Sequence, residues 1–201
     1  MNALSAYKKL HRLAPTFSTR DASMILNVSA KYASVILTRL AKNQMIVHLG
    51  RGLWAYSDNI DPLLLPTLFA HPWSCYVSLY SALYFHGMIT QIPTAVYAIT
   101  IGKTKRYKTP FGLVSLHHMN ADLFDGYKAY GPQAIYMATP EKALFDTLYL
   151  APAKSLLFAS LTEIELPKHF NKAQFKQWAA GIQNKSRRAH VLSFLPRYQT
   201  G

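Results

Sequence analysis

The chain of 201 residues is poor in cysteine, in long apolar runs and in acids, and each shortage excludes a class of protein. Its single cysteine, Cys75, rules out an internal disulfide and a cysteine-rich zinc site, which fits a reducing compartment. The longest apolar run, residues 62–70, is too short to span a bilayer, and residues 1–13 lack the uninterrupted apolar core of a signal peptide. We therefore expect a soluble, cytoplasmic protein without a membrane partner.

Acidic residues are scarce throughout, and the bases are unevenly distributed. Nine Asp and Glu stand against 22 Lys and Arg, for a net charge of +13. Residues 1–57 hold eight bases and one acid, residues 58–167 hold seven bases and eight acids, and residues 168–201 hold seven bases and no acid. Two basic ends favour a polyanionic partner, because each neutralised phosphate releases condensed counterions. The alternative is a basic face that is merely solvated.

Residues 1–58 have the pattern of a winged helix-turn-helix domain. A first helix is predicted over residues 3–13 from the spacing of its apolar positions. Ser18 and Asp21 form a capping box, since the serine hydroxyl accepts an amide proton while the carboxylate lies at the positive end of a second helix. Ile25 is predicted to belong to the buried face of that helix.

A third helix is predicted after a tight turn at Asn27, a residue that tolerates the left-handed backbone, and Ser29 is its predicted cap. Its apolar residues recur three and four positions apart and form one inward stripe: Ala33, Ile36, Leu37 and Leu40. The opposite face has bases and hydroxyls but no acid, so we expect it to contact DNA. With the neighbouring bases, the predicted DNA-binding residues are Arg20, Ser29, Lys31, Tyr32, Ser34, Val35, Thr38, Arg39, Lys42 and Arg51.

A β-hairpin, the wing of the motif, is predicted to follow, with strands over residues 45–49 and 53–56 and Arg51 at the tip of the turn. Within the DNA-binding set, four side chains are expected to face base edges: Lys31, Ser34, Val35 and Thr38. Val35 is suited to contact a thymine methyl group. Four bases are expected to contact phosphates and to set the register: Arg20, Arg39, Lys42 and Arg51.

Residues 59–201 are predicted to form a second domain of mixed helices and strands, which gives an α+β fold. Helices are predicted over residues 76–85, from 140 onward, and near 172–181 and 185–195; strands are predicted over 95–101, 112–118 and 134–138. The last two helices are rich in bases. We expect a second basic surface there, formed by Lys168, Lys172, Lys176, Lys185, Arg187 and Arg188.

Residues suited to catalysis are few. The Gly102-Lys103-Thr104 sequence lacks the upstream glycine of a phosphate-binding loop. Asp122 and Asp125 lie three apart in a predicted loop, where they are typical turn formers, and they are also the pair that a nuclease would use to hold a divalent metal. His117 and His118 point to opposite faces of a strand and are poorly placed to share a metal. We predict no enzymatic activity, no cofactor and no metal site.

Residues 78–88, with the sequence SLYSALYFHGM, and residues 138–146, with the sequence ATPEKALFD, resemble the AbiEi family of antitoxins and transcriptional regulators in type IV toxin–antitoxin systems. The likeness extends to the N-terminal pattern and to the turn at residues 165–167 before the basic helices. It implies that the N-terminal domain binds inverted repeats in its own promoter and represses the operon. It also implies that the C-terminal domain counteracts a nucleotidyltransferase-type toxin, without requiring a stable complex.

Two other functions stay open at this point. One is a nucleic-acid-processing enzyme, a nuclease or nucleotidyltransferase that grips its substrate with the basic ends. The other is a stand-alone regulator whose aromatic-rich second domain binds a small ligand. The oligomeric state is also open, and a monomer that binds DNA cooperatively is one arrangement that fits.

Overall fold

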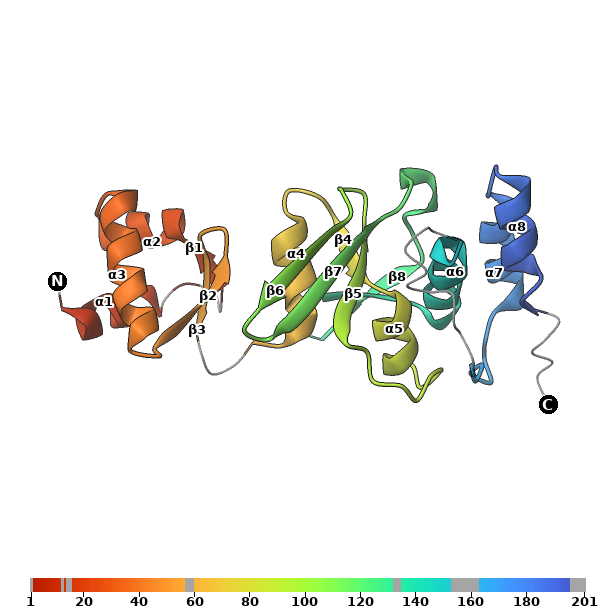
Figure 1. Cartoon of the computed structure of the whole chain (residues 1–201), viewed down its shortest axis with the longest axis horizontal. Helices are drawn as coiled ribbons and strands as arrows, with labels where there is room; N and C mark the ends of the chain where they lie inside the picture. Colours follow the sequence, from red (N-terminus) through yellow and green to blue (C-terminus); the bar gives the residue numbers. More distant parts are fainter. Residues whose placement is uncertain are drawn as a thin grey trace. The chain divides into compact units, whose positions relative to one another are not determined.

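The computed structural model describes residues 2–11, 13, 16–56, 60–131, 135–152 and 163–195 (Figure 1). The chain divides into two compact units: an N-terminal unit, Met1–Pro62 with Lys108–Phe111, and a C-terminal unit, Leu63–Tyr107 with Gly112–Gly201. Each unit combines helices with its own sheet, so the fold is α+β. The domain boundary predicted between residues 58 and 59 lies outside the described residues. None of the described helices has the length and apolar character needed to cross a bilayer.

The N-terminal unit contains three helices and a three-stranded antiparallel sheet in the order β1-β3-β2 (Figure 1). The helices are α1 (Ala3–Leu10), α2 (Thr19–Leu26) and α3 (Ala30–Lys42). The strands are β1 (Thr16–Ser18), β2 (Ile46–Gly50) and β3 (Leu53–Tyr56). One apolar core joins the helices to the sheet, and its members include Leu10, Phe17, Leu26, Leu37, Ile46 and Trp54.

Most of the predicted elements of this unit are present, with three differences. The first helix ends at Leu10, three residues short of its predicted end. Strand β1 was not predicted, because three residues are too few to show an alternating pattern. Ile25 was placed on the buried face of α2 and is instead 41% exposed. The helix buries Ala22 and Leu26, which are four residues apart, and the 100° step between neighbours turns Ile25 outward.

The C-terminal unit is built around a mixed six-stranded sheet in the order β6-β7-β5-β4-β9-β8. The strands are β4 (Cys75–Val77), β5 (Ala95–Thr100), β6 (Lys105–Thr109), β7 (Gly112–His118), β8 (Tyr127–Tyr130) and β9 (Ile135–Ala138). Strands β5 and β7 run parallel, as do β4 and β9, whereas β4 with β5 and β8 with β9 are antiparallel pairs.

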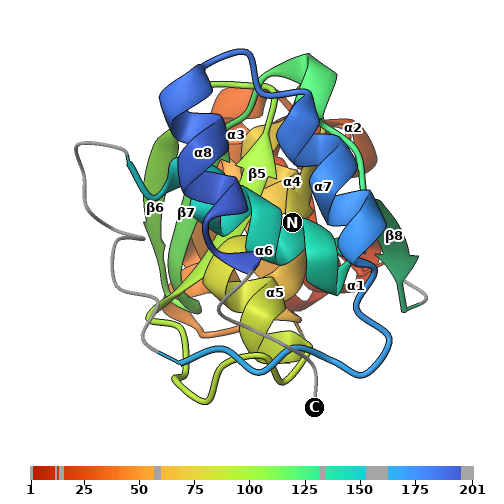
Figure 2. The same ribbon diagram turned by 90° about the vertical axis from the view of Figure 1, so that its right-hand side faces the viewer.

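Helix α6 (Pro140–Leu150) occupies the centre of the helical layer of this unit and contacts three other helices. These are α5 (Leu79–Phe85), α7 (Lys172–Ala180) and α8 (Lys185–Leu192), and Figure 2 shows α7 and α8 lying over α6. The remaining helical segments are α4 (Leu65–Ala70) and two short 3-10 turns, Pro62–Leu64 and Ala121–Leu123. The core beneath α7 includes Phe145, Phe175 and Trp178, so the basic C-terminal helices are packed through apolar faces.

The predicted strands of this unit are confirmed, but three others were missed. Residues 76 and 77, predicted as helix, belong to β4, whose three residues are all buried and therefore show no alternation. Strands β6 and β8 lie at the two edges of the sheet, and their largely exposed residues give no apolar pattern. The strand predicted from residue 134 begins at Ile135, and residue 134 lies outside the described residues.

Candidate nucleic-acid interface

Helix α3 has one buried face and one exposed face, as its sequence predicts. Its four stripe residues are buried: Ala33, Ile36, Leu37 and Leu40. All ten predicted DNA-binding residues are exposed, namely Arg20, Ser29, Lys31, Tyr32, Ser34, Val35, Thr38, Arg39, Lys42 and Arg51. Tyr32 and Val35 are 44% and 41% exposed, so this face presents apolar as well as basic groups to a partner. We call the exposed residues of α3, from Lys31 to Lys42, the α3 surface.

Local hydrogen bonds fix how α2 leads into α3. The Ser18 hydroxyl accepts a hydrogen bond from the Asp21 N–H at 3.1 Å, and the Asp21 carboxylate accepts one from the Ser18 N–H at 2.8 Å, which is the predicted capping box. Asn27 ends α2 in the left-handed conformation, with φ of 51°. Ser29 then caps α3, its hydroxyl accepting a bond from the Tyr32 N–H at 3.2 Å. The resulting turn is short and fully hydrogen-bonded at both caps, so it holds α3 at a defined angle.

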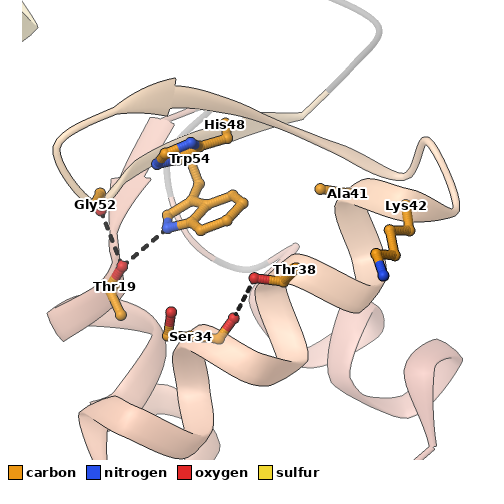
Figure 3. Close-up of a pocket in the computed structure, with 8 residues that line it drawn as sticks. All are labelled: Thr19, Ser34, Thr38, Ala41, Lys42, His48, Gly52 and Trp54. Carbon is orange, nitrogen blue, oxygen red and sulfur yellow. Dashed lines mark hydrogen bonds between the residues drawn. The ribbon is translucent and has the colours of Figure 1, made fainter.

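The β2–β3 hairpin is tied to the start of α2 by a small network (Figure 3). The Trp54 indole N–H donates to Thr19 Oγ1 at 2.9 Å, and the Thr19 hydroxyl donates to the Gly52 carbonyl at 3.1 Å. The hairpin turn has positive φ at both central residues, 51° at Arg51 and 70° at Gly52, which matches the twist of the strands. Arg51 is therefore at the tip, as predicted, on a turn that is anchored to α2.

A cavity of about 490 Å³ lies between α3 and this hairpin (Figure 3). Ser34, Thr38 and Lys42 line it from α3, and His48 and Trp54 line it from the hairpin. The His48 and Trp54 rings are in contact, with centroids 4.4 Å apart. The Ser34 hydroxyl, the Lys42 ammonium group and the His48 imidazole around one open space are groups that bind phosphate oxygens.

The Thr38 hydroxyl makes a hydrogen bond within α3, which limits the contacts that it can make with another molecule. This hydroxyl donates to the Ser34 carbonyl at 2.9 Å within the helix. The hydroxyl proton is thereby used, and the oxygen lone pairs and the methyl group remain. Thr38 is therefore suited to accept a hydrogen bond from an amino group of a base, or to contact a thymine methyl group.

The positive charge of the α3 surface is not neutralised within the unit. Among the described residues no carboxylate lies within salt-bridge distance of Lys31, Arg39 or Lys42, and both of the ion pairs found there belong to Lys142. Asp21, the one acid of residues 1–57, is engaged in the capping box. An uncompensated basic face of this kind attracts a polyanion over the range of the Debye length.

Sequence reasoning missed three residues of this interface: Thr19, His48 and Trp54. Thr19 directly follows the predicted cap residue Ser18, and His48 and Trp54 lie in the two strands predicted for the hairpin. His48 and Trp54 are direct partners in the β2–β3 register and thus share a face of the hairpin. The predicted hairpin carried that signal, because pairing residues 45–49 with 53–56 about the turn at residues 50–52 places residue 48 opposite residue 54.

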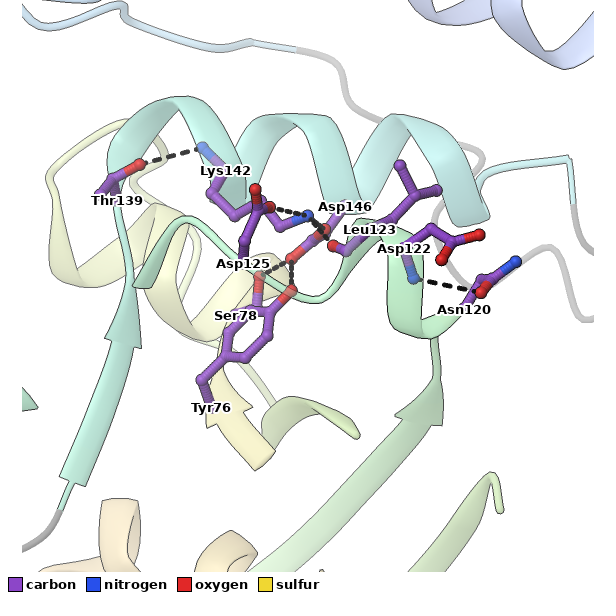
Figure 4. Close-up of polar contacts among 9 residues, drawn as sticks. All are labelled: Tyr76, Ser78, Asn120, Asp122, Leu123, Asp125, Thr139, Lys142 and Asp146. Carbon is purple, nitrogen blue, oxygen red and sulfur yellow. Dashed lines mark hydrogen bonds and ion pairs between the residues drawn. The ribbon is translucent and has the colours of Figure 1, made fainter. Parts of the chain in front are cut away.

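The second charged group of the molecule is buried in the C-terminal unit (Figure 4). The Lys142 and Asp146 side chains have no exposed surface, and Lys142 Nζ lies 3.1 Å from Asp146 Oδ1. Asp146 Oδ2 accepts bonds from the Ser78 hydroxyl at 2.7 Å and the Tyr76 hydroxyl at 3.0 Å. Burial raises the pKa of Asp146, and the attraction of Lys142 opposes that rise. Since neither charge can be reached from outside, the group is suited to hold α6 on the sheet and not to act on a substrate.

The two aspartates considered for a metal do not converge. Asp125 lies 3.6 Å from Lys142 Nζ, whereas the Asp122 N–H is bonded to the Asn120 side chain at 3.2 Å in a 3-10 turn. Residues 2–11, 13, 16–56, 60–131, 135–152 and 163–195 contain no group of three His, Cys, Asp or Glu side chains placed to hold a metal ion. The turn-forming role predicted for Asp122 agrees with this geometry.

The histidines and the cysteine have structural environments. His117 is buried and bonded to Ser115, while His118, on the opposite face of β7, is bonded to the Gly102 carbonyl. Burial lowers the pKa of His117 to about 4, with a smaller contribution from Arg106. Burial also raises the pKa of the Cys75 thiol to about 11, which leaves it protonated and unreactive.

Only half of the six bases predicted to form a C-terminal basic surface are exposed. Lys168, Lys176 and Lys185 are exposed, whereas the other three bases are half-buried: Lys172, Arg187 and Arg188. The Arg187 guanidinium lies over the Tyr149 ring, 4.7 Å from its centroid, and so contributes to packing. The C-terminal bases are thus more closely tied to the fold than those of the α3 surface.

Comparison of the sequence with protein-family models and with curated proteins finds no match. Function must therefore be inferred from the exposure, charge and hydrogen bonds of these residues.

Proposed function

We propose that this protein is a DNA-binding transcriptional repressor whose N-terminal unit is a winged helix-turn-helix domain. In this proposal α3 is the recognition helix and the β2–β3 hairpin is the wing. The single observation that carries it is the acid-free, unpaired basic face of α3 beside the open cavity under the hairpin. The short turn between α2 and α3 is the arrangement in which the second helix enters the major groove.

Contacts to base edges would come from the middle of the α3 surface. Ser34, Val35 and Thr38 are exposed and lie within little more than one helical turn, so they can reach neighbouring base pairs. Val35 and the Thr38 methyl group suit a thymine, and the Thr38 oxygen suits an amino group. Lys31, nearer the start of the helix, would extend the same row.

Contacts to phosphates would surround these residues. Arg39 and Lys42 extend from the last turn of α3, Arg20 lies in the first turn of α2, and Arg51 is at the hairpin tip. Charges on three separate elements can follow the backbone on both sides of a groove, which fixes the register without reading sequence. The cavity lined by Lys42 and His48 is where we place one backbone phosphate.

The C-terminal unit would supply the second half of the proposed activity, action as the antitoxin of a type IV toxin–antitoxin system. Support for this half is the resemblance of residues 78–88 and 138–146 to AbiEi proteins. We propose that the unit counteracts a nucleotidyltransferase-type toxin without catalysis of its own. Coexpression with the product of the adjacent reading frame tests it: the chain should restore growth, and unchanged toxicity would contradict this half alone.

DNA recognition is tested by mobility shift with the upstream region of the gene and with a shuffled duplex of the same length and composition. Wild type should prefer the native duplex by about a thousandfold or more, within the range of specific regulators. Val35→Ala should reduce that preference, while Lys103→Ala, a charge change on the C-terminal unit, should leave it intact. Equal affinity for both duplexes would contradict a sequence-specific repressor.

The enzymatic alternative has its own test. Labelled DNA or RNA is incubated with the protein and Mg²⁺, in parallel with an Asp122→Ala variant. We expect no turnover from either. Turnover that Asp122→Ala abolishes would replace the repressor with a nucleic-acid-processing enzyme.

A further inference from the structure

A second cavity, of about 400 Å³, lies in the C-terminal unit, apart from the proposed DNA interface. It is formed where α5 ends, α6 begins, and β8 and β9 meet the segment around residues 167–169. Its volume falls within the range of small-molecule sites. The residues that matter for its chemistry are Phe85, His86, Lys128, Tyr130, Met137 and His169.

Two aromatic rings stand open at this cavity. Phe85 and Tyr130 are 41% and 42% exposed and form an edge-to-face pair with centroids 4.7 Å apart. Tyr130 belongs to an edge strand and Phe85 to the last position of α5, so the pair bridges two elements. Met137, which is buried, lines the same cavity. Open rings beside an apolar wall form a slot that accepts another flat ring, because stacked and edge-to-face contacts both stabilise it.

One positive group, Lys128, lies on the same face of the strand as Tyr130. Lys128 and Tyr130 are two residues apart on β8, and Lys128 is paired with Met137 in the β8–β9 register, so all three share one side. Among the described residues Lys128 has no carboxylate within salt-bridge distance. The one acid of the cavity, Glu141, accepts a bond from the Asn171 N–H at 2.8 Å. Lys128 is therefore the positive group that this face of β8 offers to a ligand, and Glu141 is engaged by the Asn171 N–H.

His86 gives the cavity a fixed polar edge. Its Nε2 lies 2.7 Å from the Ala138 carbonyl, and since a carbonyl only accepts, Nε2 is the donor. The ring is thus held in one orientation where α5 ends. The Ala138 carbonyl lies on β9 and is not one of those that end α5 itself.

We propose that this cavity binds a small planar aromatic carboxylate, with the ring against Phe85 and Tyr130 and the carboxylate toward Lys128. The chemistry follows from the two features above: open aromatic walls select a flat ring, and an unpaired ammonium group selects an anion. None of the cavity's lining residues belongs to the proposed DNA-binding set, so this proposal is tested separately from DNA binding.

The test uses the full chain labelled at its methionine methyl groups and titrated with indole-3-acetate. Binding should shift the Met137 methyl resonance, assigned through Met137→Leu, because a ring entering the slot adds its ring current there. Three matched probes separate the features: indole-3-acetamide lacks the charge, cyclohexylacetate lacks the flat ring, and acetate has the charge alone. We expect indole-3-acetate to bind several-fold more tightly than each of them.

Variants then connect the preference to named residues. Lys128→Gln should weaken the binding of indole-3-acetate by about two- to fivefold and leave the binding of indole-3-acetamide unchanged, as expected of an exposed ion pair. Phe85→Ala should weaken the binding of both indole compounds by about fivefold, because it removes one of the two rings of the slot. Lys103→Gln, the same charge change elsewhere on the unit, should alter neither. No Met137 shift up to about 10 mM of indole-3-acetate, or equal affinity for acetate, would overturn the proposal.

Discussion

Helices α3 and α6 both have lysine side chains, which are exposed on α3 and buried on α6. On α3 the bases are exposed and have no carboxylate partner among the described residues. On α6, Lys142 has no exposed surface and is paired with Asp146 one turn away. A buried charge needs its partners to offset the loss of water, whereas an exposed, unpaired charge is available to another molecule. The comparison separates charge that is used within the fold from charge that is exposed and unpaired among the described residues.

The same substitution on each helix gives the largest expected contrast. Lys142→Met leaves Asp146 buried without its counter-charge, so the free energy of unfolding of the C-terminal unit should fall by about 3–5 kcal/mol. Lys42→Met removes an exposed charge and should change the free energy of unfolding of the N-terminal unit by no more than about 0.5 kcal/mol. Urea unfolding followed by circular dichroism measures both.

A double variant shows whether the loss comes from the unpaired acid. Lys142→Met combined with Asp146→Asn removes both charges and keeps an oxygen that accepts from the Tyr76 and Ser78 hydroxyls, so it should recover part of the stability. If the double variant is as unstable as Lys142→Met alone, the cost arises from packing and not from charge.

Acid should destabilise the C-terminal unit through His117. His117 in the C-terminal unit has its pKa lowered to about 4 by burial, below the usual 6.5, so between these values the unfolded chain binds a proton that the folded chain does not. Stability is therefore lost as pH falls from about 6.5 to about 4, by up to about 3 kcal/mol. His117→Gln should remove this part of the pH dependence of unfolding. An unchanged pH profile in that variant would show that another group is responsible.

Loosening the hairpin should have a smaller effect, confined to the N-terminal unit. Thr19→Val keeps the shape of the side chain but leaves the Trp54 indole N–H without its acceptor, which should cost about 1–3 kcal/mol of stability. Thr19→Ser retains the hydroxyl and serves as the control. Thermal unfolding followed by Trp54 fluorescence, in a background with Trp73 and Trp178 replaced by Phe, measures the difference. Equal thermal stability of Thr19→Val and Thr19→Ser would show that the hydrogen bond from Trp54 to Thr19 does not stabilise the unit.

The smallest expected effect is on the preference of the protein for one base pair of its DNA site. Thr38→Ala should reduce the preference at one base pair by about 1 kcal/mol and leave the salt dependence unchanged. Thr38→Ser keeps the acceptor oxygen and lacks the methyl group, so it tells which of the two makes the contact. Affinities for duplexes altered one position at a time measure this. A uniform loss over all sequences would mean that Thr38 contacts the backbone.

The contrast between the helices also explains what sequence reasoning reached. The α3 surface was predictable because caps, turn and stripe are local: Ser18, Asn27 and Ser29 act on residues within five positions of themselves. The environment of Asp146 was not, since its partners Tyr76 and Ser78 are about seventy residues away and lie in or beside a strand that had been predicted as helix. The slot at Phe85 and Tyr130 likewise depends on β8, an edge strand without an apolar pattern.

The central claim is that the bases of α3 contact duplex DNA, and its most direct test is the salt dependence of binding. Fluorescence anisotropy of the native duplex is recorded at several salt concentrations for wild type and for a variant with Arg39 and Lys42 replaced by Ala. Two lost phosphate contacts should make the slope of log K against log salt less steep by about 1.8, with unfolding unchanged. An identical slope, or no binding by wild type at low salt, would contradict the claim.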